Sequence, residues 1–127
     1  MLVGIMLGGA LGAAARHLLN EGVQRLTQAT PLAGFPFATL LINVSGSMLL
    51  AFVATLQLQG GLSPRWRNWI GTGFLGAYTT FSTFSLEAHA LLGRGEWGKA
   101  AAYMLGNLLL GLLGVVAGRA LALAVTR

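Results

Sequence analysis

GTGFLGAYTTFSTFSLE, residues 71–87, is the stretch of sequence that decides the fold. It lies within an apolar run long enough to cross a bilayer, yet it places three glycines ahead of five closely spaced hydroxyl residues. Glycine and β-branched threonine both have weak helix propensity, so this composition disfavours a continuous helix. We therefore expect a membrane-spanning helix that is broken mid-membrane, near residues 76–80.

A break at this depth has a chemical consequence. It frees backbone carbonyls, and these are tolerated inside a membrane only where they line a cavity or bind an ion, for which a cation is the obvious candidate. The alternative is an unbroken helix whose hydroxyl groups bond back to the preceding turn.

Four apolar runs make up most of the chain, at residues 2–19, 37–58, 69–92 and 100–125. Each is close to or above the roughly 20 residues that cross a bilayer. Of the whole sequence, 55% is hydrophobic and only 9% is charged, whereas a soluble domain carries roughly 25% charged residues. The sequence therefore predicts a single all-α membrane domain of four transmembrane helices. Cleavage of the first run as a signal peptide is disfavoured, because no basic residue precedes it.

Several function classes are excluded by what the sequence lacks. The chain has no cysteine, so thiolate metal sites and cysteine nucleophiles are absent. The basic residues are scattered singly, which disfavours a nucleic-acid surface. No phosphate-binding loop and no Ser/His/Asp arrangement is present, so we expect neither an enzyme nor a nucleotide-binding protein.

Glycine spacing and aromatic residues predict how the helices sit. Glycines recur every four residues in the first and last runs, which favours close helix packing. We expect Trp66, Trp69, Trp97 and Tyr103, near the ends of the runs, to lie at the headgroup level. The packing glycines are Gly4, Gly8, Gly12, Gly114 and Gly118.

The basic residues are divided evenly between the two ends of the predicted bundle. One end collects Arg65, Arg67, Arg119 and Arg127, and the other collects Arg16, Arg25, Arg94 and Lys99. Because Lys/Arg asymmetry sets membrane orientation, an even split gives no preferred direction of insertion. We expect dual topology and, as its natural assembly, an antiparallel homodimer.

Two phenylalanines in residues 71–87 point to an anion. Phe81 and Phe84 are three residues apart and share a helix face, while Ser82 and Ser85 share another. Aromatic ring edges carry positive charge, so paired rings presented edge-on, with hydroxyl and amide donors, suit a small dehydrated anion. Packing against lipid or within the core is the alternative for an isolated pair of rings.

Uncharged amides lie in the second and fourth runs. Asn43 and Asn107 offer N–H donors without a charge that would trap an anion, although hydrogen bonding between helices is an equal alternative. Arg16 and Glu87 fall near the same end of the bundle. They could pair, Arg16 could concentrate anions at a vestibule, or its side chain could extend to the headgroups.

At these positions the chain resembles the Fluc/CrcB family of small bacterial fluoride channels. The resemblance covers nearly the whole chain, and its most specific part is Thr79 to Ser85. It is supported by Arg16 in the first run and by Thr39, Asn43 and Gly46 in the second. The family forms dual-topology homodimers with two fluoride pores and a central structural sodium ion, in the bacterial inner membrane.

The resemblance also implies residue roles. The sodium ligands would be the carbonyls of Gly76 and Thr79, and the ring pair would be Phe81 and Phe84. The remaining fluoride pathway would consist of Asn43, Ser82, Thr83, Thr39, Tyr103 and Asn107, with Arg16 at its vestibule. The fourth run departs from the family in having Asn107 and Gly111 where small hydroxyl residues are expected.

The function that follows is passive, fluoride-selective export down the electrochemical gradient, which protects the cell from fluoride. Two other functions share the composition. A small proton-coupled multidrug exporter would need an acidic residue deep in the first helix, and none is there. A non-transporting scaffold subunit would leave the polar cluster of the third run without a purpose.

Overall fold

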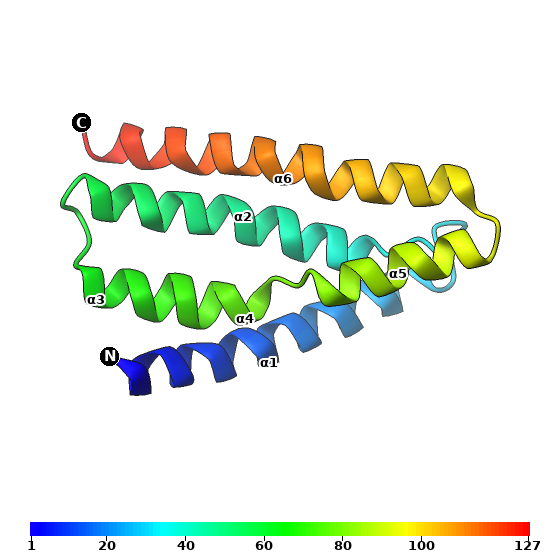
Figure 1. Cartoon of the computed structure of the whole chain (residues 1–127), viewed down its shortest axis with the longest axis horizontal. Helices are drawn as coiled ribbons and strands as arrows, with labels where there is room; N and C mark the ends of the chain where they lie inside the picture. The colour runs from blue at the N-terminus through cyan, green and yellow to red at the C-terminus, as the bar shows by residue number, and fades with distance from the viewer.

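The computed structural model describes all residues 1–127 as helices joined by short loops, with no strand. Three helices are long and apolar enough to cross a membrane, namely α1 (Leu2–Thr27), α2 (Phe37–Leu58) and α6 (Trp97–Val125). A fourth crossing is assembled in series from α3 (Pro64–Arg67), η1 (Asn68–Leu75), α4 (Gly76–Tyr78) and α5 (Ser82–Gly93). Both termini and the α2–α3 loop lie at one end of the bundle (Figure 1). The predicted all-α fold with a broken third crossing is confirmed.

The break falls at residues 79–81, at the C-terminal edge of the predicted window. Thr79 is extended, with φ −79° and ψ 158°, and the helix resumes at Ser82. The Thr79 hydroxyl does donate back to the Leu75 carbonyl at 3.0 Å, and the Ser85 hydroxyl to the Phe81 carbonyl at 2.9 Å. An unbroken helix was expected to contain bonds of this kind, from a hydroxyl to the preceding turn. They are present on both sides of the break, but the helix is still interrupted at residues 79–81.

A π-helix precedes the break, and the sequence analysis did not predict it. The N–H of Gly76 reaches back to the carbonyl of Gly71, five residues earlier. Such wide turns are rare and occur mostly as short segments within α-helices, often at functional sites. The third crossing is therefore irregular from Asn68 to Phe81.

The glycine strips pack helices together within the chain, as predicted. On α1, a Cβ at Gly8 would collide with the Trp69 carbonyl, and one at Gly12 with the backbone of Phe74. On α6, a Cβ at Gly114 would lie 2.9 Å from the Val44 carbonyl. α1 is thus held against the third crossing, and α6 against α2.

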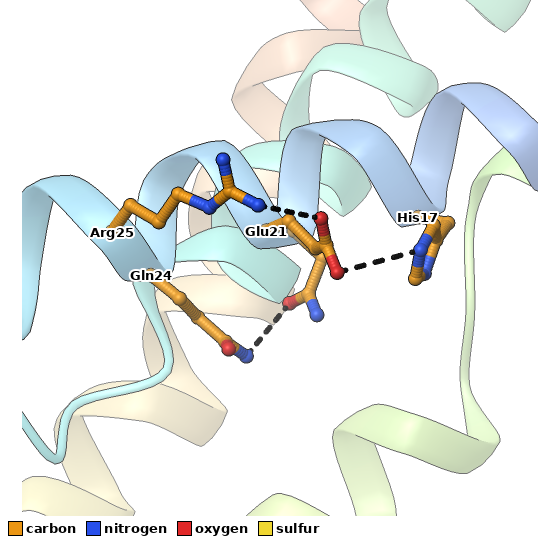
Figure 2. A network of polar contacts seen from close by, with 5 residues as sticks. His17, Glu21, Gln24 and Arg25 are labelled. Atoms are coloured by element: carbon orange, nitrogen blue, oxygen red, sulfur yellow. Dashed lines mark hydrogen bonds and ion pairs between the residues drawn. The ribbon is translucent and has the colours of Figure 1, made fainter.

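The first helix is longer than predicted. The first apolar run ends at residue 19, where the polar residues Asn20 and Glu21 begin, but α1 continues to Thr27. Polar residues end a run of apolar sequence without ending a helix. Glu21 supports the extension with an ion pair to Arg25 at 3.3 Å and a contact with His17 at 3.6 Å (Figure 2). The chain leaves the helix only as it approaches Pro31.

Tyr103 is not a headgroup anchor, so that prediction is wrong. Its side chain is fully buried, in a cluster with Ala88, Leu91 and Ala100, whereas Trp66 and Trp97 are 51% and 69% exposed. Its position in the second turn of α6 faces α5 instead of solvent or lipid. A buried hydroxyl requires a hydrogen-bond partner, and Glu87 of α5 accepts this one.

Candidate ion pathway

The break is closed by a side chain from another helix. The Oδ1 atom of Asn43, in the middle of α2, accepts the N–H of Thr80 at 2.9 Å, and its Nδ2 donates to the carbonyl of Thr80 at 3.0 Å. One amide thereby satisfies both backbone groups of a residue that has no helical partners. Such internal satisfaction is what a membrane demands of irregular backbone.

Asn43 is also joined to the fourth crossing. Its Nδ2 donates to Oδ1 of Asn107 at 2.9 Å, and Asn107 in turn donates to the carbonyl of Tyr103 at 3.0 Å. The bond from Asn43 to Asn107 is the hydrogen bond between helices that was the alternative to anion binding, whereas the bond from Asn107 to Tyr103 lies within α6. Both N–H groups of Asn43 are therefore engaged in this conformation.

Glu87 of α5 is held by hydroxyl groups. Thr39 of α2 donates to its Oε1 at 3.0 Å, and the Tyr103 hydroxyl donates to its Oε2 at 2.8 Å. Glu87 forms no ion pair with Arg16, so that alternative is not realised. Sequence reasoning did not count Glu87 among the pathway residues, although its being the one carboxylate inside a predicted span was a usable signal.

The two phenylalanines lie together beside Tyr103. The ring centroids of Phe81 and Phe84 are 5.7 Å apart at 48°, and Phe84 meets Tyr103 edge to face at 5.3 Å and 67°. Phe81 is 79% exposed on the surface of the chain, next to exposed Ser82. The ring pair thus extends from the tyrosine to an open face.

Two cavities adjoin the break. The first, of about 240 Å³, lies between α1, α2 and the start of α5 and is lined by Arg16, Thr39, Thr80 and Thr83 among others. The second, also of about 240 Å³, is lined by Asn43, Ser47, Thr79, Thr80 and Phe81 among others. Arg16 therefore lines the first cavity, and Thr80 lines both.

The backbone carbonyls of Gly76 and Thr79 lose their helical partners at the break. In a continuous helix they would accept the N–H groups of Thr80 and Thr83. The N–H of Thr80 instead bonds Asn43, and that of Thr83 bonds the Thr80 hydroxyl at 3.2 Å. Uncharged oxygens of this kind are ligands that hard cations accept.

These features define a multi-pass membrane protein whose polar groups converge on a broken helix. Residues 3–119 match the family described as CrcB-like protein, Camphor Resistance (CrcB), and the chain belongs to this family.

Named relatives resemble the chain over most of its length. It is 44% identical over 118 residues to fluoride-specific ion channel FluC 2 of Nitrobacter hamburgensis, covering 92% of each chain. It is 47% identical over 117 residues to fluoride-specific ion channel FluC of Deinococcus radiodurans, covering 92% of this chain and 90% of the relative. A third relative, a fluoride-specific ion channel FluC of Thermus thermophilus, is 46% identical over 108 residues, or 85% of this chain and 83% of the relative.

Proposed function

We propose that this protein is a fluoride-selective channel that lets fluoride leave the cell passively, down its electrochemical gradient. The observation that carries the proposal is the set of uncharged donors and ring edges around the break, in a chain whose relatives are named fluoride-specific channels. A small anion that leaves water needs close donors without a trapping charge, and these groups offer them. Catalysis is not proposed.

The physiological setting follows from acid–base chemistry. In acid surroundings the neutral acid of fluoride diffuses inward and dissociates, so the anion accumulates inside. An anion leak driven by a negative interior then exports it and lowers its toxicity. The membrane is proposed to be the bacterial inner membrane.

Each pathway residue has a proposed role that its position supports. Arg16 attracts the anion to the first cavity, and the hydroxyls of Thr39, Ser82, Thr83 and Tyr103 replace part of its hydration shell. The ring edges of Phe81 and Phe84 complete that shell beside the amides of Asn43 and Asn107. Both N–H groups of Asn43 are engaged with Thr80 and Asn107, and the hydroxyls of Thr39 and Tyr103 donate to Glu87. Donation to a passing anion by any of these three side chains therefore requires one of its present bonds to open.

The working form is proposed to be an antiparallel homodimer with two pores. The even division of basic residues removes the bias that would fix one orientation. In a single chain Phe81 is 79% exposed, so a second copy could cover this ring of the pair. A second copy related by an in-plane two-fold axis would present the same residues in return.

A structural sodium ion is proposed at the dimer axis. The carbonyls of Gly76 and Thr79 fit such an ion, because their helical donors are diverted elsewhere and uncharged oxygen is what a hard monovalent cation accepts. Two such pairs, one from each copy, would surround it. When bound, the ion neutralises carbonyl dipoles that face each other across the interface.

The proposal is tested by ion efflux from vesicles containing the purified protein. Fluoride should leave rapidly once its charge is balanced by an ionophore, and chloride should be retained. Vesicles that hold fluoride as well as protein-free vesicles do, or that release chloride equally fast, would overturn it. Proton-driven release of a hydrophobic cation without fluoride efflux would identify an exporter instead.

A further inference from the structure

The C-terminal half of α1 carries a polar stripe that begins inside the predicted membrane span and continues beyond it. Arg16, Asn20, Gln24 and Thr27 recur at three- and four-residue spacing and so share one face of the helix. The adjacent row is different in kind. There Glu21 forms an ion pair with Arg25 and contacts His17 at 3.6 Å (Figure 2). All three side chains are at least 46% exposed. The polar stripe borders the neighbouring helices, with Arg16, Asn20 and Thr27 half-buried and Gln24 exposed.

Three cavities follow one another along this stripe. The first is the Arg16 vestibule of about 240 Å³, and the outermost is a cavity of about 400 Å³ beside the α1–α2 loop and α5. Between them lies a small cavity of about 40 Å³. Asn20 and Thr39 line both the vestibule and the small cavity, and Gln24 and Glu87 line both the small and the outermost one. The shared residues place the three cavities in one row along α1, which offers an anion a route.

The small cavity is the narrow point of this route. Its volume leaves room for only a few water molecules. Asn20 and Gln24 form one wall, and Thr39 and Glu87 belong to the other. An anion at the narrow point is repelled by the carboxylate, so favourable contacts must come from the amide wall.

The amides have donors to offer. Gln24 Nε2 donates to Asn20 Oδ1 over a long 3.3 Å, and Nδ2 of Asn20 donates to no group of the chain. Figure 2 shows the Gln24 side chain extending back along α1 toward this contact. The carboxylate oxygens opposite already accept the hydroxyls of Thr39 and Tyr103, which leaves less of their charge exposed to the route.

We propose that Asn20 and Gln24 are the donor wall of the access route between the α1–α2 loop surface and the Arg16 vestibule. They bind the hydrated or partly hydrated anion on its way to the break. This inference rests on the proposed fluoride channel and adds two specificity-determining residues to it. It also gives the extension of α1 to Thr27 a purpose.

The absence of cysteine from the chain permits a clean test with single-cysteine variants. Asn20→Cys and Gln24→Cys would be treated with two water-soluble thiol reagents of similar size, anionic sulfonatoethyl and cationic trimethylammonioethyl methanethiosulfonate. Leu18→Cys is the control, because Leu18 is 67% exposed on another face of α1 and should face lipid. We expect both route cysteines to be labelled and Leu18→Cys to remain unlabelled.

Fluoride efflux gives the second readout. The anionic reagent should slow efflux through Asn20→Cys and Gln24→Cys by about tenfold, the equivalent of one lost hydrogen bond to a charged group. The cationic reagent should slow it less. The unmodified Asn20→Leu and Gln24→Leu variants should also lose about tenfold, whereas Gln57→Leu, at the opposite end of the bundle, should not.

The two readouts separate the two proposals. If the unmodified protein passes no fluoride, the proposed function fails, and labelling still reports whether the route contains water. If the unmodified protein conducts but Asn20 and Gln24 variants conduct equally well before and after labelling, the donor wall is refuted. Absence of labelling at both route positions refutes it as well.

Discussion

Asn43 and Thr80 form a closed pair in which one side-chain amide bonds both backbone groups of a residue 37 positions away, at 2.9 and 3.0 Å. The bonds make α2 a structural part of the third crossing. Without them, an N–H and a carbonyl would be unsatisfied near the middle of the bundle, at a cost of several kcal/mol if both faced lipid. The break therefore depends on a side chain as much as on its own sequence.

Asn43→Asp should disrupt both conduction and folding. The substitution replaces Nδ2 by an acceptor, which would face the Thr80 carbonyl and Asn107 Oδ1 with no hydrogen between them. The added negative charge also repels an anion. We expect at least tenfold slower fluoride efflux and a loss of about 1–3 kcal/mol in the free energy of unfolding.

The control for this substitution is Asn68→Asp, which makes the same change of charge at the start of the third crossing, away from the break. Its efflux should remain within about twofold of the original. An Asn43→Asp protein that conducts faster than the original would contradict the role given to this amide.

Replacement of either ring should slow conduction while leaving assembly intact. In Phe81→Ile or Phe84→Ile, the aliphatic side chain keeps much of the apolar surface but loses the positive ring edge. The loss should be greater for Phe84, which also contacts Tyr103 edge to face at 5.3 Å. Efflux and the size of the purified assembly would be measured together.

Phe52→Ile is the matched control for the rings, because Phe52 lies on α2 and lines none of the cavities described above. It should leave efflux unchanged. Unaltered efflux in both ring variants would argue against a pathway past the ring edges.

The sequence predicted the parts of the fold that depend on local composition. Hydropathy located the four crossings, and the weak helix formers of residues 71–87 located the break. The end of α1 was missed because Asn20 and Glu21 change the polarity of the chain without opposing a helix. The π-helix at Asn68–Leu75 was missed because propensities do not distinguish it from an α-helix.

The partners of the polar residues could not be predicted in the same way. Glu87 binds Thr39, which is 48 positions away, and this choice over Arg16 depends on how α2, α5 and α6 pack. Tyr103 was expected at the headgroups because it lies near the end of a run, yet α6 begins earlier, at Trp97, and turns the ring inward. Position along a run sets depth in the membrane but not the direction of a side chain.

Gly118→Ala should destabilise the protein through the contact between α6 and α2. A Cβ at Gly118 would collide with the carbonyl of Met48, which is backbone and has little freedom to move. We expect a loss of about 1–3 kcal/mol in the free energy of unfolding, measured in mixed detergent micelles. Gly22→Ala is the control, because no atom lies within 4 Å of its added Cβ. It should be neutral or slightly stabilising, and equal effects of the two would refute the packing argument.

Sodium should stabilise the assembly and support conduction. If the carbonyls of Gly76 and Thr79 hold a sodium ion between two copies, its removal leaves carbonyl dipoles opposed across the interface. We expect a lower unfolding temperature and slower fluoride efflux when sodium is replaced by N-methylglucamine on both sides of the membrane. Equal stability and equal efflux in the two media would remove the ion from the proposal.

The orientation of the chain should be switchable by single charges. Because four basic residues lie toward each end, one more at an exposed position beside a helix end should bias insertion. Gln59→Arg adds a charge at the end that holds both termini, and Gly98→Arg adds one at the opposite end, where no atom lies within 4 Å of the new Cβ. In cells, a C-terminal tag on the original chain should be found on both sides of the membrane, and on mainly one side for each variant.

Function should follow orientation if the dimer is antiparallel. Each variant expressed alone should give several-fold less fluoride resistance, because oppositely inserted partners become scarce. Expression of Gln59→Arg together with Gly98→Arg should restore resistance, since each supplies the orientation that the other lacks. The antiparallel dimer would be excluded if the tag on the original chain lay on one side only, or if a variant inserted in one direction gave full resistance. Neither result would test the ion pathway within each chain, which the efflux measurement tests.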